Sequence, residues 1–191
     1  MSSIDSLTRR RTTLAFAWSA MGDVSVNRMT AEDTIQVAGA GPAGLAAAIT
    51  LARAGRRVVV HEAQRTVGYR FQRDLQGIEN WTSAQDALQT LRELGITTRF
   101  PAIPCTEGSA YDAWGVAYRV RSRKPIFYLV ERGPRAGSFD HALLAHAIEL
   151  GVEVRFNSRV RQVQGIDVLA TGPKAADAIA AGYHFDTDMQ D

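Results

Sequence analysis

Residues 35–48 read IQVAGAGPAGLAAA, and this stretch decides the fold of the chain. A short apolar run ends at Gly39, which is typical of a buried strand over residues 34–39. Pro42 suits the first turn of a helix, and the residues after it are almost all apolar. Gly55 is placed to end that helix, and RRVVVHE at 56–62 predicts a second strand. A strand, a helix and a strand within about 30 residues form the smallest unit of a parallel sheet.

The three glycines of this stretch have separate physical uses. Gly39 permits a tight turn out of the strand, Gly41 lets a pyrophosphate approach the backbone, and Gly44 lets the helix pack close to the strand. The free N–H groups at the start of the helix and the positive end of its dipole attract phosphates. The candidate cofactor-binding residues in this turn are Gly39, Gly41, Pro42, Ala43 and Gly44.

An acid at the end of the predicted second strand completes the pattern. Glu62 follows Gly44 by 18 residues, and a carboxylate there accepts hydrogen bonds from ribose hydroxyls. Because it would repel a 2′-phosphate, an unphosphorylated adenosine ribose is favoured over NADP. An ordinary turn or a solvated strand end explains either part alone, but the combination predicts a dinucleotide-binding unit.

The remaining sequence continues the alternation of helices and strands. Further predicted elements are a helix at 82–94 capped at its start, antiparallel strands within 96–130, a helix at 138–150, and parallel strands at 152–156 and 166–172. The predicted fold class is therefore α/β: a Rossmann-like parallel sheet with an inserted, partial antiparallel β-region.

The composition is ordinary for a globular domain. Hydrophobic residues make up 46% and charged residues 22% of the 191 residues, and the net charge of +2 gives no case for nucleic-acid binding. A single cysteine, Cys105, excludes an internal disulfide and a multi-cysteine metal site. No metal constellation or nucleophile elbow is visible, so we predict no metal and assign no catalytic side chain. No run approaches the ~18 apolar residues of a membrane span, and we expect a cytoplasmic protein.

The first 33 residues precede the predicted domain. Arg9–Arg11 and the short apolar patch after them match an export signal of the twin-arginine kind only weakly. The alternatives are a disordered extension, or an upstream start codon assigned before a true start at Met29. We expect a disordered extension over residues 1–33.

Four sequence blocks resemble a known group of proteins. GAGPAGLAAA, with Ala48 extending the glycine pattern, is similar to the FAD-binding fingerprint of the glutathione-reductase-like flavoprotein fold. The blocks at 67–82 (VGYRFQRDLQGIENWT), 128–156 (YLVERGPRAGSFDHALLAHAIELGVEVRF) and 170–190 (ATGPKAADAIAAGYHFDTDMQ) resemble the geranylgeranyl-reductase-like group of FAD-dependent (NAD(P)/FAD) oxidoreductases. The resemblance covers residues 34–191, which would form one partial FAD-binding domain with the β-insertion at about 96–130 on the substrate side.

The resemblance implies how the first part of the site meets FAD. The three glycines would lie against the pyrophosphate region, and Glu62 would lie against the adenosine ribose. Gly68 and Arg70 match a glycine–arginine segment that runs along the cofactor, although Tyr69 stands where a second glycine is usual.

The resemblance also assigns positions later in the chain. Val160 matches a position whose backbone meets the adenine, and Thr171 and Gly172 match a turn near the FAD. Members of the group carry a later Gly-Asp motif that holds the ribityl and phosphate part of FAD, and no such pair follows Thr171 here. We therefore expect a truncated chain, or a chain completed by a second polypeptide.

Three functions remain open from the sequence. The leading one is an FAD-dependent oxidoreductase that reduces a C=C bond of a small hydrophobic substrate, with NAD(P)H as the candidate electron donor. The second is a truncated or split nucleotide-binding module without activity of its own. The third is an NAD-dependent dehydrogenase, which Glu62 fits equally well.

Overall fold

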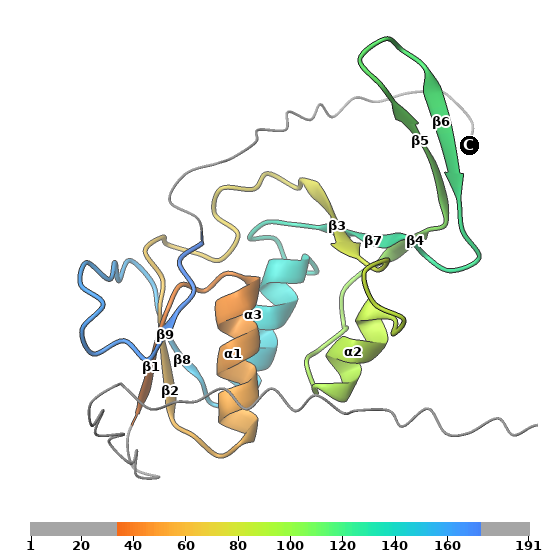
Figure 1. The fold of residues 1–191 in the computed structure, drawn as a ribbon. Coiled ribbons are helices and arrows are strands. Elements are labelled where there is room, and N and C mark those ends of the chain that lie inside the picture. Colours follow the sequence, from red (N-terminus) through yellow and green to blue (C-terminus); the bar gives the residue numbers. More distant parts are fainter. Residues whose placement is uncertain (1–33, 173–191) are drawn as a thin grey trace, which may run out of the picture. The chain divides into compact units, whose positions relative to one another are not determined.

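The structure is a computed structural model that describes residues 34–172 (Figure 1). The chain divides into two units, residues 1–30 and 31–191, and all described residues belong to the second. The expectations for residues 1–33 and for 173–191 lie outside the described residues. In chain order the elements are β1 (Ile35–Ala38), α1 (Pro42–Arg53), β2 (Val58–His61), β3 (Leu75–Glu79), α2 (Ala87–Glu93), β4 (Ile103–Cys105), β5 (Glu107–Tyr111), β6 (Ala117–Arg121), β7 (Phe127–Glu131), α3 (Phe139–Glu149), β8 (Glu153–Arg155) and β9 (Val168–Leu169).

The predicted parallel sheet is present. Its four strands lie in the order β8-β2-β1-β9, and every neighbouring pair is parallel. In the register of β1 and β2, Val37 is paired with Val60, and Val37 is also paired with Val168 of β9. The β9 strand is shorter than the 166–172 segment expected from the sequence, because only two residues pair with β1.

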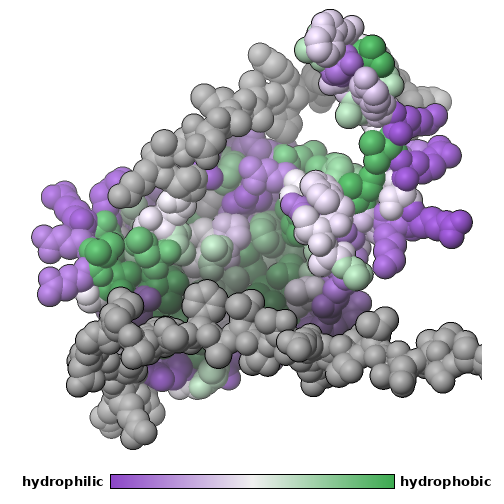
Figure 2. All heavy atoms as spheres, viewed as in Figure 1, coloured by the Kyte–Doolittle hydropathy of each residue, from purple (hydrophilic) through white to green (hydrophobic). Residues whose placement is uncertain are grey.

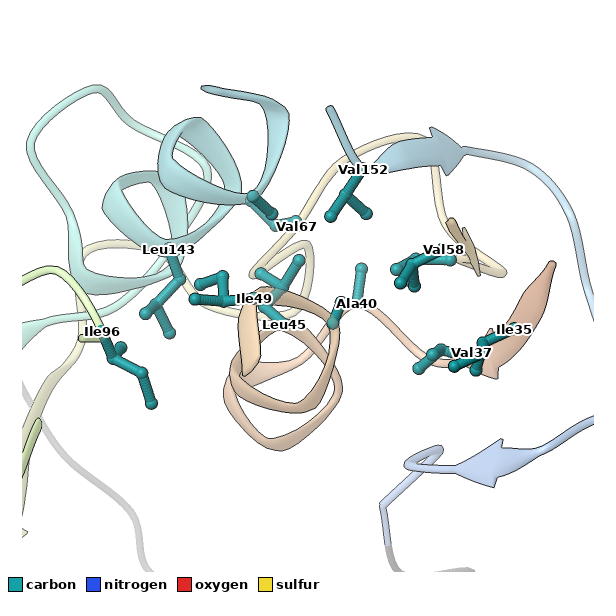
Figure 3. Packing of buried hydrophobic residues seen from close by; sticks show 13 residues of the cluster. Ile35, Val37, Ala40, Leu45, Ile49, Val58, Val67, Ile96, Leu143 and Val152 are labelled. Atoms are coloured by element: carbon teal, nitrogen blue, oxygen red, sulfur yellow. The ribbon is translucent and has the colours of Figure 1, made fainter. Parts of the chain in front are cut away.

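The main hydrophobic core lies between this sheet and two helices. Val37 and Val60 of the sheet are fully buried, as are Leu45 and Ile49 of α1, and Leu143 of α3 is 1% exposed (Figure 3). Burying one such side chain stabilises the fold by about 1.5–3 kcal/mol. The run of small and apolar residues in α1 is explained by its position, since this helix packs against both the sheet and α3.

Two of the three predicted helices begin and end as expected. Gly55 follows α1 with φ +76°, and Gly151 follows α3 with φ +81°. These left-handed conformations suit glycine at a helix end. The Ser138 hydroxyl accepts a hydrogen bond from the His141 N–H at 3.2 Å, which caps the start of α3.

The prediction that α2 begins with a cap at Thr82 is wrong. The helix begins at Ala87, and Asp86 caps it by accepting hydrogen bonds from the N–H groups of Leu88 and Gln89. The side chain of Asn80 also accepts a hydrogen bond from the Ala87 N–H at 2.6 Å. These side-chain acceptors satisfy N–H groups of the first turn, so residues 82–85 remain outside the helix.

The antiparallel strands expected within 96–130 form two separate sheets. One has the order β3-β7-β4, and the other is the hairpin of β5 and β6. The strand β3 precedes the predicted range and was not expected from its sequence, which contains Gly77. In the structure most of its residues are exposed. The hairpin is exposed along both strands, and Trp114 at its turn is 86% exposed. Figure 2 shows hydrophobic side chains at the surface of this hairpin.

Candidate cofactor site

A groove of about 910 Å³ lies at the carboxyl ends of the parallel strands. Residues that end or follow β1, β2 and β9 line it, which is where ligands bind in open α/β sheets. Ten of the eleven predicted site residues line this groove: Gly39, Gly41, Pro42, Ala43, Glu62, Gly68, Arg70, Val160, Thr171 and Gly172. The structure thus brings together residues from four separate segments of the chain.

The first and third glycines of the turn are required by backbone packing. Gly39 has φ +99°, and a Cβ atom there would lie 2.4 Å from the carbonyl oxygen of Ala170. A Cβ atom at Gly44 would lie 1.9 Å from the carbonyl oxygen of Gly39. Gly44, the predicted residue that does not line the groove, therefore acts from behind it by letting α1 approach the turn.

The second glycine has a different environment. Nothing lies within 4 Å of the position that a Cβ atom of Gly41 would occupy, and its φ of −74° is open to any residue. Packing therefore does not require a glycine here. The open space fits a ligand that approaches the backbone, as the sequence pattern predicts.

The start of α1 is available to an anion. Gly41 is the N-cap, no side chain caps the helix, and its first turn contains no acidic residue. The free N–H groups of this turn, to which Pro42 contributes none, and the positive end of the helix dipole are therefore not neutralised by a carboxylate of the helix itself. A phosphate is the group that such a helix end binds most readily.

Glu62 connects the end of β2 to the glycine turn. Its Oε2 accepts a hydrogen bond from the Ala40 N–H at 2.9 Å, and its Oε1 accepts one from the Gln64 N–H at 2.8 Å. An ionised carboxylate offers about four acceptor positions, so two remain for ribose hydroxyls. The Glu62 N–H donates to the carbonyl oxygen of Arg155 at 2.8 Å, which fixes this residue beside β8.

The backbone structure requires a glycine at position 68, for a reason that the sequence did not indicate. Its φ is +59°, and a Cβ atom there would lie 2.7 Å from the carbonyl carbon of Gly133. The loop after β2 and the loop between β7 and α3 thus meet backbone to backbone. Arg70, two residues further on, lies with its guanidinium 4.9 Å from the ring centre of Phe71.

The sequence reasoning missed a buried ion pair in the wall of the groove. Arg132 donates from Nε and Nη2 to the two carboxylate oxygens of Asp140, each at 2.8 Å. The side chains are 12% and 1% exposed, and Asp140 also accepts a hydrogen bond from the Gly133 N–H at 2.9 Å. The signal in the sequence was an acid in the first turn after the Ser138 cap, with an arginine just before the loop.

Arg132 is held in place from a second side. Its guanidinium lies 4.3 Å from the ring centre of Phe71, and Nη1 donates to the side-chain oxygen of Gln76. Three of its five N–H donors are therefore used within the protein.

His61 lines the groove but has partners on both ring nitrogens. Nε2 lies 2.8 Å from Oε1 of Gln36, and Nδ1 lies 2.8 Å from the hydroxyl of Ser158. Since an amide oxygen only accepts, Nε2 carries the proton and Nδ1 accepts from Ser158. With both ring nitrogens occupied by protein partners, His61 has a structural role at the end of β2.

Residues 34–172 contain neither a metal-binding cluster nor a membrane-spanning helix. In this part of the chain, no group of three or more histidine, cysteine, aspartate or glutamate side chains is placed to hold a metal ion. No helix within the same residues has the length and apolarity needed to cross a membrane.

Comparison with known proteins supports the fold. The family model of the NAD(P)-binding Rossmann-like domain matches residues 37–80. No curated protein sequence matches the chain. Among solved structures, p-nitrophenol 4-monooxygenase PnpA from Pseudomonas putida DLL-E4 is 24% identical with a TM-score of 0.50, and the match covers 65% of this chain and 32% of that enzyme.

Two further structures match over similar lengths. A geranylgeranyl bacteriochlorophyll reductase-like protein from Thermoplasma acidophilum is 22% identical, with a TM-score of 0.49 and coverage of 65% and 30% of the two chains. The protein CtdE, solved in complex with FAD, is 22% identical, with a TM-score of 0.42 and coverage of 66% and 30%. The chain spans about a third of the length of these proteins. Its described part has a mixed α/β fold with a Rossmann-like parallel sheet, and p-nitrophenol 4-monooxygenase PnpA has a similar fold over the matched residues.

Proposed function

We propose that the groove binds FAD by its adenosine half and that the chain functions as part of an FAD-dependent oxidoreductase. The observation that carries this proposal is the joint placement of the uncapped start of α1 and the Glu62 carboxylate in one groove. These two features are complementary to a pyrophosphate and to ribose hydroxyls, respectively.

Several of the predicted residues have an assigned contact in this proposal. The pyrophosphate would lie over Gly41 and the first turn of α1, the ribose at Glu62, and the adenine at the backbone of Val160. Arg70 and Arg132 line the same groove, and their guanidiniums suit the phosphate charge. Thr171 and Gly172 would close the side of the groove next to β9. When bound, FAD supplies the electron transfer, and the side chains described here bind and orient it.

We further propose that the substrate is a small hydrophobic molecule with a C=C bond that the enzyme reduces, with NAD(P)H as electron donor. This proposal rests on the resemblance of the sequence blocks at 67–82, 128–156 and 170–190 to the geranylgeranyl-reductase-like group. The groups that enclose the flavin ring would come from residues outside 34–172 or from a second polypeptide. We propose that the protein works in the cytoplasm.

An absorbance spectrum of the purified chain tests the cofactor directly. We expect flavin bands in the near-UV and blue, and release of FAD on denaturation. Calorimetric titration with FAD and with NAD then distinguishes the proposal from an NAD-dependent dehydrogenase, since only FAD should bind tightly. A colourless protein that does not take up FAD would contradict the proposal.

The alternative of a nucleotide-binding module without activity of its own is tested separately. A chain that binds FAD but does not oxidise NAD(P)H in the presence of an artificial electron acceptor would support this alternative over the enzyme.

A further inference from the structure

A second pocket, of about 540 Å³, adjoins the groove and is rich in arginine. It lies where the loop after β2 meets the loop between β7 and α3, the two loops joined by the contact of Gly68 and Gly133. Five arginines line it: Arg65, Arg70, Arg73, Arg132 and Arg135. Among the described residues, no aspartate or glutamate is part of its lining.

The positive charge of this pocket is only partly balanced. Arg132 is paired with Asp140, whereas Arg73 and Arg135 share the single carboxylate of Glu131 at 3.8 Å and 3.2 Å. Among the described residues, these five guanidinium groups therefore have two carboxylates as ion-pair partners. The uncompensated charge favours an anion in the pocket.

The other two arginines lie against aromatic rings. The guanidinium of Arg65 is 5.3 Å from the ring centre of Tyr69, and that of Arg70 is 4.9 Å from that of Phe71. Such stacking restricts a guanidinium without using its N–H donors, so these donors remain available to an anion.

Arg73 is placed by a specific local backbone. It has φ +68°, which is uncommon for a residue other than glycine. Asp74 holds this turn from both sides, since its carboxylate accepts from the Gln72 N–H at 2.8 Å and its carbonyl oxygen accepts from the Arg132 N–H at 2.8 Å. The turn therefore presents Arg73 at the pocket in a defined position.

We propose that this pocket binds the phosphate group of a small molecule. A phosphate monoester carries a charge close to −2 at pH 7, and its oxygens accept bidentate hydrogen bonds from several guanidiniums at once. A ligand with a single carboxylate would leave more of the positive charge of the pocket unbalanced than a phosphate monoester does. Arg65, Arg73 and Arg135 do not line the FAD groove, so this site stands whether or not the groove holds FAD.

Calorimetric titration of the full chain at low ionic strength tests the proposal. The probes are inorganic phosphate, adenosine 2′,5′-bisphosphate and succinate. The variants are Arg65→Gln and the double substitution Arg73→Gln with Arg135→Gln, and Arg123→Gln is the matched control because this exposed arginine lies outside both pockets. We expect phosphate binding to weaken about tenfold or more in the site variants and to be unchanged in the control.

The outcomes distinguish a nucleotide ligand from free phosphate. They also distinguish failure of this proposal from failure of the proposed function. Tighter binding of the bisphosphate indicates a nucleotide ligand, whereas similar binding of both phosphate probes indicates free phosphate. FAD affinity should stay unchanged in the Arg73 and Arg135 double variant, because these two residues do not line the FAD groove. If the native chain binds no FAD, the proposed function fails and the phosphate proposal still stands.

The proposal is overturned if neither phosphate probe binds, if succinate binds as tightly, or if the site variants bind like the control. A measurement on the unmodified chain covers the case in which a variant does not fold. Phosphate should protect Arg65, Arg73 and Arg135, but not Arg123, from modification by phenylglyoxal, and equal modification of all four would overturn the proposal.

Discussion

The carboxylate of Glu62 accepts a hydrogen bond from the N–H of Ala40 at 2.9 Å, which joins the end of β2 to the turn between β1 and α1. The acid predicted to meet a ribose thus also fixes the turn predicted to meet the pyrophosphate. The two halves of the proposed cofactor site are therefore coupled through one side chain, and a change at Glu62 should affect both stability and binding.

Replacement of Glu62 by glutamine tests this coupling. Glutamine has one side-chain oxygen for the two N–H donors of Ala40 and Gln64, so one donor loses its partner. We expect a loss of unfolding free energy of about 1–2 kcal/mol and weaker FAD binding. Urea denaturation and FAD titration measure the two effects. Glu79→Gln, at an exposed strand end, should change neither, and equal behaviour of the two variants would contradict the assignment.

Alanine substitutions should separate the roles of two glycines in the turn. Gly44→Ala places a Cβ atom 1.9 Å from a backbone oxygen, so we expect a destabilisation of about 1–3 kcal/mol or more. Gly41→Ala meets no atom within 4 Å and should keep the stability of the native chain while losing FAD affinity. Thermal unfolding and FAD titration of both variants provide the comparison, and a fully stable Gly44→Ala protein would disprove the packing argument.

The ion pair between Arg132 and Asp140 should matter far more than exposed pairs. Asp140→Asn leaves a nearly buried guanidinium without its carboxylate, and we expect a cost of about 3–5 kcal/mol. The exposed pair of Arg121 and Glu107 serves as the control, since Glu107→Gln should cost less than about 1 kcal/mol. Chemical denaturation of both variants measures the difference, and similar losses would show that burial does not set the strength of the first pair.

His146 should make stability depend on pH in the mildly acidic range. Burial lowers the pKa of His146 below its ordinary value of 6.5, with Arg99 and Arg53 acting in the same direction and Glu149 against it. Its Nδ1 accepts the N–H of Thr97 at 3.1 Å, which requires the neutral ring. The unfolded chain then binds more protons, so the unfolding free energy decreases as pH falls from about 6.5 through the lowered pKa.

The substitution His146→Asn keeps a hydrogen-bond acceptor and removes the titration. We expect the unfolding free energy of this variant to change less between pH 7 and pH 5 than that of the native chain. His141→Asn is the matched control on the same helix and should leave the pH dependence as it is. The same slope in all three proteins would refute the role of His146.

The parallel sheet and its glycine turn could be predicted from the sequence, whereas some of the long-range pairings could not. The glycine turn, α1 and β2 follow from neighbouring residues such as Gly39 and Pro42, whose backbone preferences act within a few positions. By contrast, β3 exists because it pairs with β7, some 50 residues away, and its own sequence alternates poorly. The pairing of Arg132 with Asp140 likewise depends on tertiary structure, because a charged side chain shows its burial only in the folded chain.

The short strand β9 has a consequence for how the molecule folds. In β9 only Val168 and Leu169 pair with β1, and they follow Ile35, the first residue of the sheet, by more than 130 residues. Hydrogen bonds between Gln36 and Asp167 lie at the start of this contact. Closing so long a loop costs entropy that the β1, α1 and β2 unit does not incur. We therefore expect the side of the groove at Thr171 and Gly172 to assemble late in folding, and a ligand that contacts it would stabilise the pairing of β9 with β1.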